Sequence, residues 1–500
     1  MKFGLFFEHQ VPRPWDADAD RRVLSEALEQ VELADRLGFD HVWAVEHHFL
    51  EEYAHSAAPE LFLAAASQRT RQIRLGHGIV LMPPAYNHPA RVAERVATLD
   101  VLSGGRVDFG AGESGSRTEL EGFDVDPREK RLMWRECFEQ ICEMLARDPY
   151  PGFEGRYFRM PVRNVVPKPI QRPHPPLWMA CPKRDTLRLA AAHGVGALTF
   201  SFLTPDEARG WIDDYYTTYA AECVPIGHVT NPHVALVAPL AIAPDRATAH
   251  AESDEHFQFF RWSMGHYYDF GRHRPGVTDV WASFQAARPR LGGLAAPGVE
   301  VPGFGTPEDL IRQLEGFEAA GADQITFLAA YGKKPHAQVM AGLELFGREV
   351  LPRFRARAEA RAQAKAERLA EATRAAMARK TWAPALQPEH VPEHWALGRG
   401  LMPGESLPPL DAEVMAAMAA SSSHRPATFP RARDEVVATL FGRPRRGAGA
   451  QAPAPPPRAE PTARAEPTAR AEAPRRAEPK ARVKPSQGSA RRARRPRAPR

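Results

Sequence analysis

Short apolar segments alternate with helical segments across residues 1–355, and this alternation is what most constrains the fold. The segments with the length and composition of buried strands are 3–7, 42–45, 74–81, 106–110, 177–180, 197–201, 234–242 and 324–328. Between them, apolar residues recur at helical spacing, as Leu24, Leu28 and Val31 do. Strands that alternate with helices form parallel sheets, and eight of them predict a closed (β/α)8 TIM barrel of the α/β class instead of an open sheet.

Two parts of the chain depart from this pattern, namely residues 250–305 and the residues after 355. Residues 250–305 interrupt it before the last strand, with many aromatic residues first and Gly and Pro later. They are too long for an ordinary connection and predict an insertion that covers a pocket. We expect three parts: a barrel domain over 1–355, a helical and irregular extension over 356–442, and a tail over 443–500.

The tail differs from the rest of the chain in charge. Residues 443–500 carry 17 Lys and Arg against 4 Asp and Glu, a net charge of +13, whereas the preceding residues carry −8. From Arg458 the tail repeats a six-residue Ala/Glu/Pro/Arg unit that contains no aromatic residue. Such a segment cannot bury enough apolar surface to order itself, so we expect disorder. Its charge suits a weak nucleic-acid contact, or simply a solvated tail without a ligand.

Ionisable residues follow the second predicted strand, in the sequence Val45-Glu46-His47-His48-Phe49. Side chains at the carboxyl end of a barrel strand are where enzymes of this architecture place their chemistry. Neighbouring residues of an extended backbone point to opposite faces, so the two histidines are not expected to share a metal ion. One of them is expected to face a central pocket while the other supports it; the alternative is a pair of loop histidines near the surface.

Two further stretches could bind a cofactor. Gly110, Gly112 and Gly115 match the spacing of a dinucleotide fingerprint, but they follow the fourth strand and no helical pattern begins directly after them. They indicate a strand exit that approaches a ligand closely, or a tight turn. Residues 183–186 begin a helix after the fifth strand, which favours either phosphate binding or an ordinary helix cap.

The cysteines and the apolar runs bear on the cell compartment. Cys137, Cys142, Cys181 and Cys223 lack the spacing of a zinc site or a disulfide framework. The apolar run at the start is too short for a signal peptide, and no stretch approaches the length of a membrane helix. These features predict a cytoplasmic protein without a membrane contact and without a metal.

Several separated motifs carry a family resemblance. They are Met1-Lys2-Phe3-Gly4, Gly38-Phe39-Asp40-His41-Val42-Trp43, Glu46-His47-His48-Phe49, His88-Pro89-Ala90-Arg91 and Leu102-Ser103-Gly104-Gly105-Arg106. In this order they resemble bacterial luciferase and the flavin-dependent monooxygenases grouped with it, the luciferase-like monooxygenase superfamily, over about residues 1–355. The tail lies outside the resemblance.

The resemblance implies an FMN-dependent monooxygenase that uses reduced FMN and O2 to oxygenate a hydrophobic small organic substrate through a flavin peroxide. No nicotinamide-binding pattern is recognisable, so a separate flavin reductase is expected to supply the reduced FMN. A homodimer is favoured by the resemblance alone. Two alternatives stay open: a deazaflavin-dependent oxidoreductase that transfers hydride on the same barrel, and a non-catalytic barrel tethered to nucleic acid by its tail.

The resemblance also assigns residues. His47 matches the catalytic histidine, with Glu46 and His48 beside it. The expected cofactor-binding residues are Gly78, Ile79, Gly112, Glu113, Ser114, Arg131, Cys181, Lys183 and Thr186. Relatives carry a non-prolyl cis peptide at the position of Gly78 and Ile79. Gly112 and Glu113 stand where luciferases have cysteine and arginine, so light emission is not expected.

Overall fold

The computed structural model describes residues 1–292, 294 and 301–393, and it contains the predicted parallel barrel. The order of the strands is β3-β2-β1-β13-β10-β9-β8-β5-β4, and a pairing between β3 and β5 closes the ring. Every pairing of this sheet is parallel. The strands are β1 Lys2–Phe7, β2 His41–Ala44, β3 Arg74–His77, β4 Val80–Leu81, β5 Val107–Gly112, β8 Leu177–Ala180, β9 Gly196–Thr199, β10 Val234–Pro239 and β13 Gln324–Leu328.

The third predicted strand is divided. It forms β3 and β4, which are separated by Gly78 and Ile79 and both pair with β5. The two pieces occupy one position in the ring, so the barrel has the eight strand positions that the alternation predicted. The interruption therefore changes the course of one strand at the carboxyl end of the barrel without changing the architecture.

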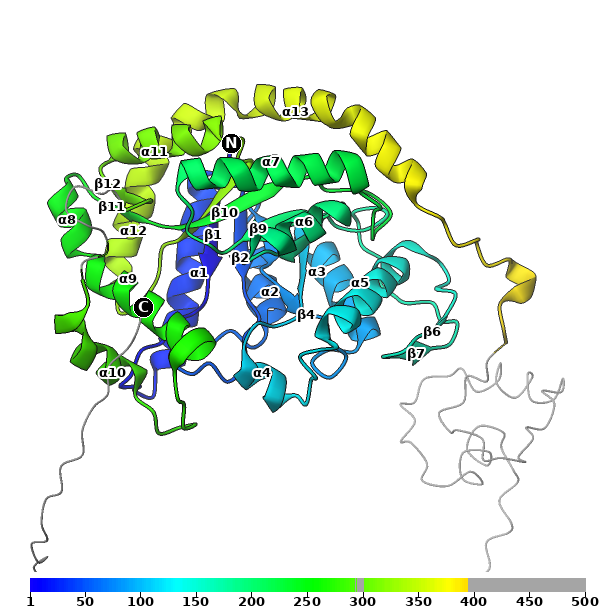
Figure 1. The fold of residues 1–500 in the computed structure, drawn as a ribbon, viewed down its shortest axis with the longest axis horizontal. Coiled ribbons are helices and arrows are strands. Elements are labelled where there is room, and N and C mark those ends of the chain that lie inside the picture. The colour runs from blue at the N-terminus through cyan, green and yellow to red at the C-terminus, as the bar shows by residue number, and fades with distance from the viewer. Residues whose placement is uncertain (293, 295–300, 394–500) are drawn as a thin grey trace, which may run out of the picture. The chain divides into compact units, whose positions relative to one another are not determined.

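Helices surround the barrel (Figure 1). They are α1 Ala19–Leu37, α2 Pro59–Arg69, α3 Pro89–Ser103, α4 Arg117–Gly122, α5 Lys130–Ala146, α6 Arg184–Ala192, α7 Pro205–Glu222, α11 Pro307–Ala319 and α12 His336–Leu345. Local signals set their ends. Helix α1 ends at Gly38, whose φ of 88° lies in the left-handed region that glycine tolerates. Helix α11 begins after Thr306, whose hydroxyl accepts a hydrogen bond from Asp309 N.

Two indole rings fill the inside of the barrel. Trp43 on β2 and Trp178 on β8 are fully buried, with ring centroids 4.9 Å apart. Glycines make room for them, since a Cβ on Gly76 would lie 2.2 Å from Trp43 and one on Gly196 would lie 2.5 Å from Trp178. A second apolar layer packs between the strands and the outer helices. The interior is thus a packed core, as in other barrels of this size.

An excursion interrupts the barrel between β10 and β13, as the sequence predicted. It contains β11 Ala241–Ile242, α8 Arg246–Ala251, α9 Asp254–Gly265, η1 His266–Phe270, α10 Val280–Ala287, η2 Arg288–Arg290 and β12 Phe304–Gly305. Its buried aromatic residues form one cluster with Phe6, Trp43 and Trp178 from the barrel. The excursion therefore shares a core with the inside of the barrel. A smaller hairpin, β6 Phe153–Glu154 with β7 Arg159–Met160, follows α5.

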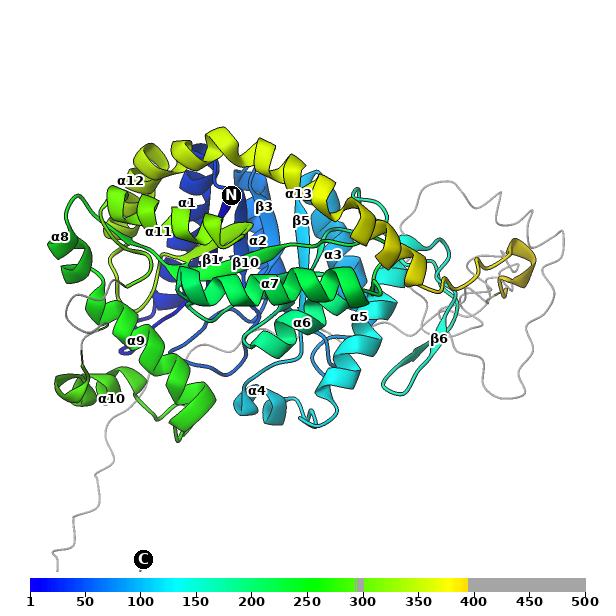
Figure 2. The ribbon, with the colours of Figure 1, turned by 45° about the horizontal axis from the view of Figure 1, so that its top comes forward.

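Helix α13, Leu351–Arg379, follows the π-helical turn η3 Phe346–Val350 and crosses the amino-terminal end of the barrel (Figures 1 and 2). Phe354 contacts Phe3 edge to face at 5.4 Å, and Lys365 pairs with Asp323 at 2.8 Å. The predicted boundary between residues 355 and 356 falls inside this helix, and the compact unit extends to Trp395. The short turn η4 Pro388–His390 is the last element described.

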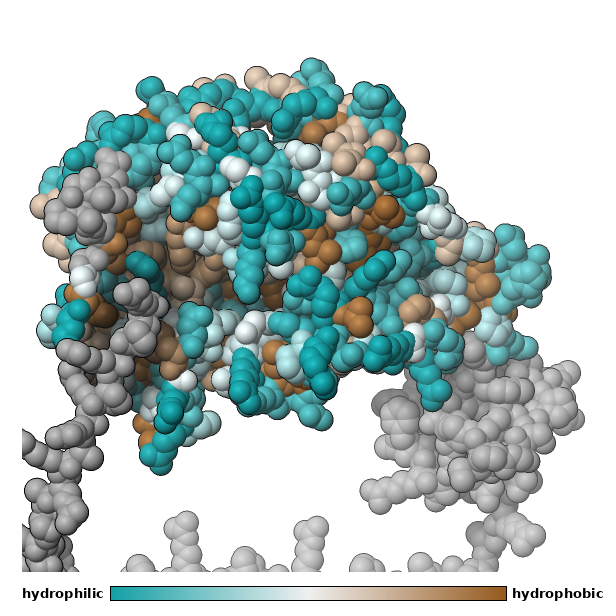
Figure 3. Space-filling model, viewed as in Figure 1, coloured by the Kyte–Doolittle hydropathy of each residue, from teal (hydrophilic) through white to brown (hydrophobic). Residues whose placement is uncertain are grey.

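Polar side chains cover most of the visible surface, and apolar ones gather in a hollow beside the excursion (Figure 3). Among the described residues, no helix combines the length and the hydropathy needed to cross a membrane. The predicted tail, 443–500, and most of the predicted extension lie outside the described residues.

Candidate active site

His47 lies between two carboxylates at the carboxyl end of the barrel. It lies on the loop that follows β2. Two backbone hydrogen bonds hold this loop, from Val45 N to Phe7 O at 3.3 Å and from His47 N to Ser56 O at 3.0 Å. Its Nδ1 is 2.9 Å from Glu119 Oε1 on α4, and its Nε2 is 3.6 Å from Glu8 Oε2, directly after β1. Three segments of the chain therefore converge on this one ring.

The site favours a positive charge on His47. Burial opposes that charge, but Glu119 overcomes it with help from Glu8 and Glu46, and the pKa of His47 rises to about 9. Burial tends to raise the pKa of Glu119, yet His47 and the hydrogen bonds to this carboxylate lower it overall. Burial raises the pKa of Glu8 to about 7. Near neutral pH, His47 is a cation paired with an ionised Glu119, while Glu8 is close to its midpoint.

Glu46 and His48 form a separate group beside this pair. Glu46 accepts hydrogen bonds from Leu81 N at 2.8 Å and Asn87 Nδ2 at 2.9 Å, and His48 Nε2 lies 3.1 Å from its carboxylate. These bonds tie the loop after β2 to β4 and the start of α3. His48 N also donates to Glu119 Oε1 at 3.0 Å. The two histidine rings thus have different partners, and Glu46 and His48 help to hold His47 in place.

The glycine-rich exit of β5 packs against the break between β3 and β4. A Cβ on Gly110 would lie 2.1 Å from His77 O, and one on Gly112 would lie 2.4 Å from Ile79 Cδ1. Gly110 is therefore required by close packing against a backbone oxygen, whereas a Cβ on Gly112 would need the Ile79 side chain to move. The cis peptide bonds of the described residues all precede proline, so the bond between Gly78 and Ile79 is trans. The non-prolyl cis bond that relatives carry at this position is therefore not found here.

Positive charge gathers around the loop after β5. Arg131 forms a two-pronged ion pair with Glu113, at 2.6 and 2.7 Å. Burial and the neighbouring cations Arg131 and Lys183 lower the pKa of Lys130, against the opposing effect of Glu113. Lys130 also donates a hydrogen bond to Ser114 O. Lys183 has no ion pair within the part of the chain that the structure describes. Glu113 therefore neutralises Arg131, whereas the charges of Lys130 and Lys183 have no carboxylate partner among the described residues.

The loop before α6 uses its side chains to form the helix start. Lys183 N donates to Thr186 Oγ1 at 3.2 Å, and this hydroxyl donates to Lys183 O at 2.7 Å. Cys181 is fully buried, its Sγ lies 3.4 Å from Thr186 O, and burial raises the pKa of its thiol. Cys181 and Thr186 therefore shape the loop, and Lys183 is the member of this predicted group with a free charge.

The excursion adds tyrosines to the site. The ring of Tyr268, in η1, lies 6.4 Å from that of His47 and 6.0 Å from that of Tyr53. A Cβ on Gly115 would lie 3.3 Å from Tyr268, so the loop after β5 and the excursion meet at this glycine. Tyr53 OH donates to Glu8 Oε1 at 3.0 Å. The excursion therefore covers the side of the site that holds His47.

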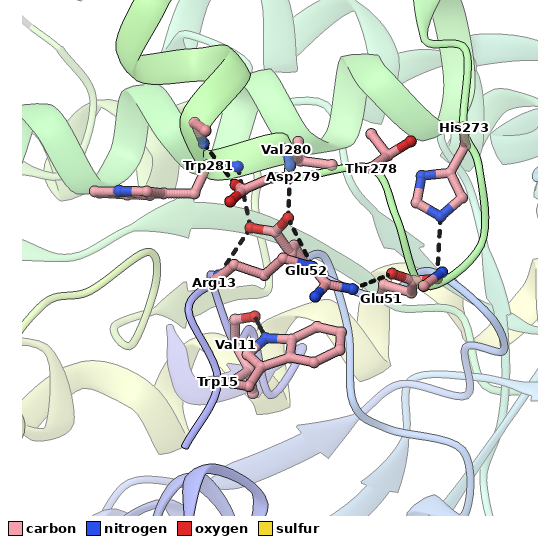
Figure 4. A network of polar contacts seen from close by, with 12 residues as sticks. Val11, Arg13, Trp15, Glu51, Glu52, His273, Thr278, Asp279, Val280 and Trp281 are labelled. Atoms are coloured by element: carbon pink, nitrogen blue, oxygen red, sulfur yellow. Dashed lines mark hydrogen bonds and ion pairs between the residues drawn. The ribbon is translucent and has the colours of Figure 1, made fainter. Parts of the chain in front are cut away.

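Two acidic residues fasten the excursion to the barrel (Figure 4). The buried Glu52 carboxylate accepts hydrogen bonds from Arg13 N at 2.8 Å, Val280 N at 2.6 Å and Trp281 N at 3.0 Å. It thus caps the first turn of α10. Glu51 accepts from Gly276 N at 2.7 Å and pairs with His273 at 3.2 Å. Arg13 reaches both carboxylates, so one network joins three segments.

An open groove with a volume of 360 Å³ lies beside His47. Its lining is mainly apolar and comprises Trp15, His47, Phe49, Leu50, Glu51, Ala54, His55, Ser56 and Ala57. Phe49 is 52% exposed and Trp15 37% exposed, which are large values for aromatic side chains. The groove offers an apolar surface that reaches the catalytic candidate.

The sequence patterns did not single out Glu8, Tyr53, Glu119, Lys130 or Tyr268. Glu8 had a usable signal, because it is an acidic residue directly after a buried strand. Glu119 follows Ser116 by three residues, which is the pattern of a helix capping box. In the structure Ser116 makes no side-chain cap and Glu119 binds His47 instead. Nothing local in the sequence marks Tyr268 as part of this site.

Comparison with known proteins identifies the relatives of the chain. Residues 1–324 match the model of the family described as luciferase-like monooxygenase. The oxygenase component of the flavin-dependent trigonelline monooxygenase of Acinetobacter baylyi is 26% identical over 374 residues, which cover 71% of this chain and 96% of that protein. Limonene 1,2-monooxygenase of Rhodococcus erythropolis is 43% identical over 148 residues, 29% of this chain and 36% of that enzyme. Another relative, the uncharacterized protein y4wF of Sinorhizobium fredii, is 36% identical over 194 residues. These residues cover 39% of this chain and 54% of that protein.

Solved structures show the same fold. The monooxygenase RslO1 of Streptomyces bottropensis superposes with a TM-score of 0.56 at 26% identity, covering 71% of this chain and all of that one. An F420-dependent secondary alcohol dehydrogenase superposes with a TM-score of 0.53 at 19% identity, covering 70% of this chain and 98% of that one. At 19% identity, the similarity to the dehydrogenase shows a shared fold and nothing more.

Proposed function

The chain belongs to the luciferase-like monooxygenase family, and from this premise we propose that it uses reduced FMN and O2 to oxygenate a hydrophobic small organic molecule. The observation that carries the proposal is His47, held as a cation between Glu8 and Glu119 at the carboxyl end of β2. A fixed and partly buried proton donor beside the barrel mouth suits a reaction in which protons must be supplied at one place.

The residues of the β5 exit fit the phosphate of a flavin nucleotide. Ser116 Oγ is buried and makes no hydrogen bond to any residue that the structure describes. Lys130 and Lys183 supply positive charge nearby, and Ser114 lies in the same loop. A hydroxyl without a partner and a cationic pair are suitable donors for an anionic group. Lys130, Lys183 and Ser116 would hold the phosphate, with Arg131 contributing only if it exchanges Glu113 for the ligand.

Reduced flavin, when bound, supplies the electrons and the reaction with O2. The residues of the chain then have three tasks. His47 holds or gives up a proton at Nε2, Glu119 and His48 fix the loop, and Tyr53 and Tyr268 keep water away from this ring. The relative from Acinetobacter baylyi is the oxygenase component of its trigonelline monooxygenase, which supports a separate reductase as the source of reduced flavin for this protein as well.

The groove beside His47 supports a hydrophobic substrate. Its aromatic and aliphatic wall, with Trp15 and Phe49 exposed, favours apolar compounds such as terpenes, aldehydes or alkanes over charged ones. A hydrophobic pocket discriminates weakly between related apolar molecules, so the proposal concerns the class of substrate.

Anaerobic titration of the purified protein with reduced FMN, followed by rapid mixing with O2, tests the proposal. We expect saturable binding and a rate of FMN oxidation that differs from that of free FMN. Product formation from a panel of terpenes, aldehydes and alkanes would follow. No binding of reduced FMN, together with binding of a reduced deazaflavin, would instead place the protein among the hydride-transferring enzymes of this fold.

Replacement of His47 separates an enzyme from a binding protein. We expect His47→Gln to lower product formation by about 100-fold or more, as removal of a positioned proton donor does. His390→Gln, on the exposed turn η4, is the matched control and should leave the rate unchanged. An unchanged rate in His47→Gln would remove the catalytic assignment and favour a barrel without turnover.

A further inference from the structure

Glu8 is a buried acid whose carboxylate is only half engaged. It follows β1 directly and is 2% exposed. Its Oε1 accepts a hydrogen bond from Tyr53 OH at 3.0 Å. Its Oε2 accepts none from the residues that the structure describes, and it lies 3.6 Å from His47 Nε2. A buried carboxylate oxygen without a hydrogen bond is rare and costly, so it invites a functional explanation.

The second carboxylate beside His47 is in a different state. Glu119 accepts hydrogen bonds from Ser114 Oγ at 2.7 Å and from His48 N at 3.0 Å, in addition to its contact with His47 Nδ1. These donors stabilise its ionised form. Glu119 is therefore a fixed counter-ion, whereas Glu8 has a free oxygen that can accept a proton.

We propose that Glu8 is a positioning residue that adjusts the protonation of His47 beside the fixed counter-ion Glu119, by accepting the proton of His47 Nε2 at its own Oε2. This inference rests on the proposed function of His47. In the step, the N–H bond of the imidazolium breaks and an O–H bond forms on Glu8. The ion pair becomes a neutral imidazole beside a neutral acid, and the net charge of the pair is unchanged. The reverse step returns the proton.

The surroundings allow this exchange. The titratable groups that face the pair are Tyr53, Tyr268, Glu119 and Glu46. Burial raises the pKa of both tyrosines well above their ordinary value, so they stay neutral. The pKa values of about 7 for Glu8 and about 9 for His47 predict two titration steps, which belong to the pair as a unit.

Histidine NMR of the full-length protein without flavin tests the proposal. The imidazole carbon of His47 is labelled and assigned by its loss in His47→Gln, and its shift is followed from pH 5 to 10. In Glu8→Gln we expect the upper midpoint to fall by about one pH unit and the lower step to vanish, because the neighbouring charge is gone. Glu121→Gln, an exposed carboxylate on α4, is the matched control.

A second variant, Tyr53→Phe, tests the proposal even if Glu8→Gln does not fold. Tyr53→Phe removes the hydrogen bond to Glu8 Oε1, so the lower step should move to higher pH while the upper step remains. An unchanged His47 titration in both variants would overturn the proposal. Binding of reduced FMN is measured on the same samples, so loss of flavin binding with an intact NMR effect would count against the proposed function alone.

Discussion

The charge on His47 depends on residues that are distant in the sequence. Glu119 is 72 positions away, and Glu8 is in the first strand exit. A partly buried cation persists only if counter-ions compensate for the hydration that it has lost. The pair of His47 and Glu119 is thus expected to affect stability, in addition to the catalytic role that we propose for His47, and its effect must depend on pH.

Glu119→Gln should destabilise the protein in a limited pH window. The pKa of His47 is raised from 6.5 to about 9, so its contribution is complete below pH 6.5 and is lost as the pH rises through 9. The pKa of Glu119 is lowered from 4.5, so its contribution is present above that value and is lost as the pH falls. We expect a loss of about 2 kcal/mol at roughly pH 5 to 6.5, which shrinks toward pH 10.

Thermal unfolding midpoints measured across this range check the prediction, with Glu121→Gln as the control for removing a carboxylate from α4. The glutamine keeps the shape and can still accept from His47 and His48. A difference between the variant and the original protein that is the same at every pH would show that the ion pair is not its cause.

The break between β3 and β4 is the element that shapes the carboxyl end of the barrel. Gly78 N bonds to Ala44 O at 2.8 Å, and Met82 N bonds to Gly112 O at 2.9 Å, so both sides of the break stay attached to neighbouring strands. Gly110 lies beneath it against His77 O. Strand packing therefore explains Gly110, the first glycine of the spacing that resembles a nucleotide fingerprint.

Gly110→Ala should distort this element. Its Cβ would lie 2.1 Å from a backbone oxygen, which cannot rotate away as a side chain could. We expect a loss of stability of about 2 kcal/mol or more, typical of overpacking in a core, together with weaker binding of reduced FMN. Gly292→Ala is the matched control, because no atom of the described residues lies within 4 Å of its Cβ position. Unfolding by denaturant measures the loss, and equal stability of the two variants would contradict this account.

Glu52→Ala should release the excursion from the barrel. The change leaves the N–H groups of Arg13, Val280 and Trp281 without their common acceptor, and each buried unpaired donor costs about 1 kcal/mol or more. We expect faster hydrogen exchange at Val280 and Trp281 and faster proteolysis within α10. Glu308→Ala removes an exposed carboxylate from the first turn of α11 and serves as the control. Exchange rates that match those of the control would show that the cap does not hold the excursion.

In the molecule as a whole, the excess of positive charge lies in a different part of the chain from the barrel. The barrel contains the candidate site, whereas the +13 charge belongs to residues 443–500, which lie outside the described residues. The weak contact of the tail with nucleic acid and the homodimer remain predictions.

Removal of the tail tests its contact with nucleic acid. We expect the full-length chain to be retained on immobilised DNA at low salt and released as salt rises, because such binding depends on the displacement of counter-ions. A protein truncated after Gly442 should pass through at all salt concentrations while binding reduced FMN as before. Equal retention of the two proteins would assign the contact to the barrel, or to none.

Local patterns along the chain were enough to predict the order of strands and helices, the excursion, and the position of His47, Glu46 and His48 at a strand end. These features depend on local periodicity and on order along the chain, so one sequence is enough to predict them. The roles of the individual site residues remain predictions.

The groups that surround His47 could not be predicted in this way, because they come together only when the barrel closes. Closure of the barrel brings Glu8 from β1 and Glu119 from α4 to opposite sides of one ring, and the excursion adds Tyr268 from 221 positions further along the chain. The tertiary structure also pairs Arg131 with Glu113, and the bond between Gly78 and Ile79 is trans. These outcomes follow from contacts between distant segments, whose geometry is set by packing and not by any local pattern.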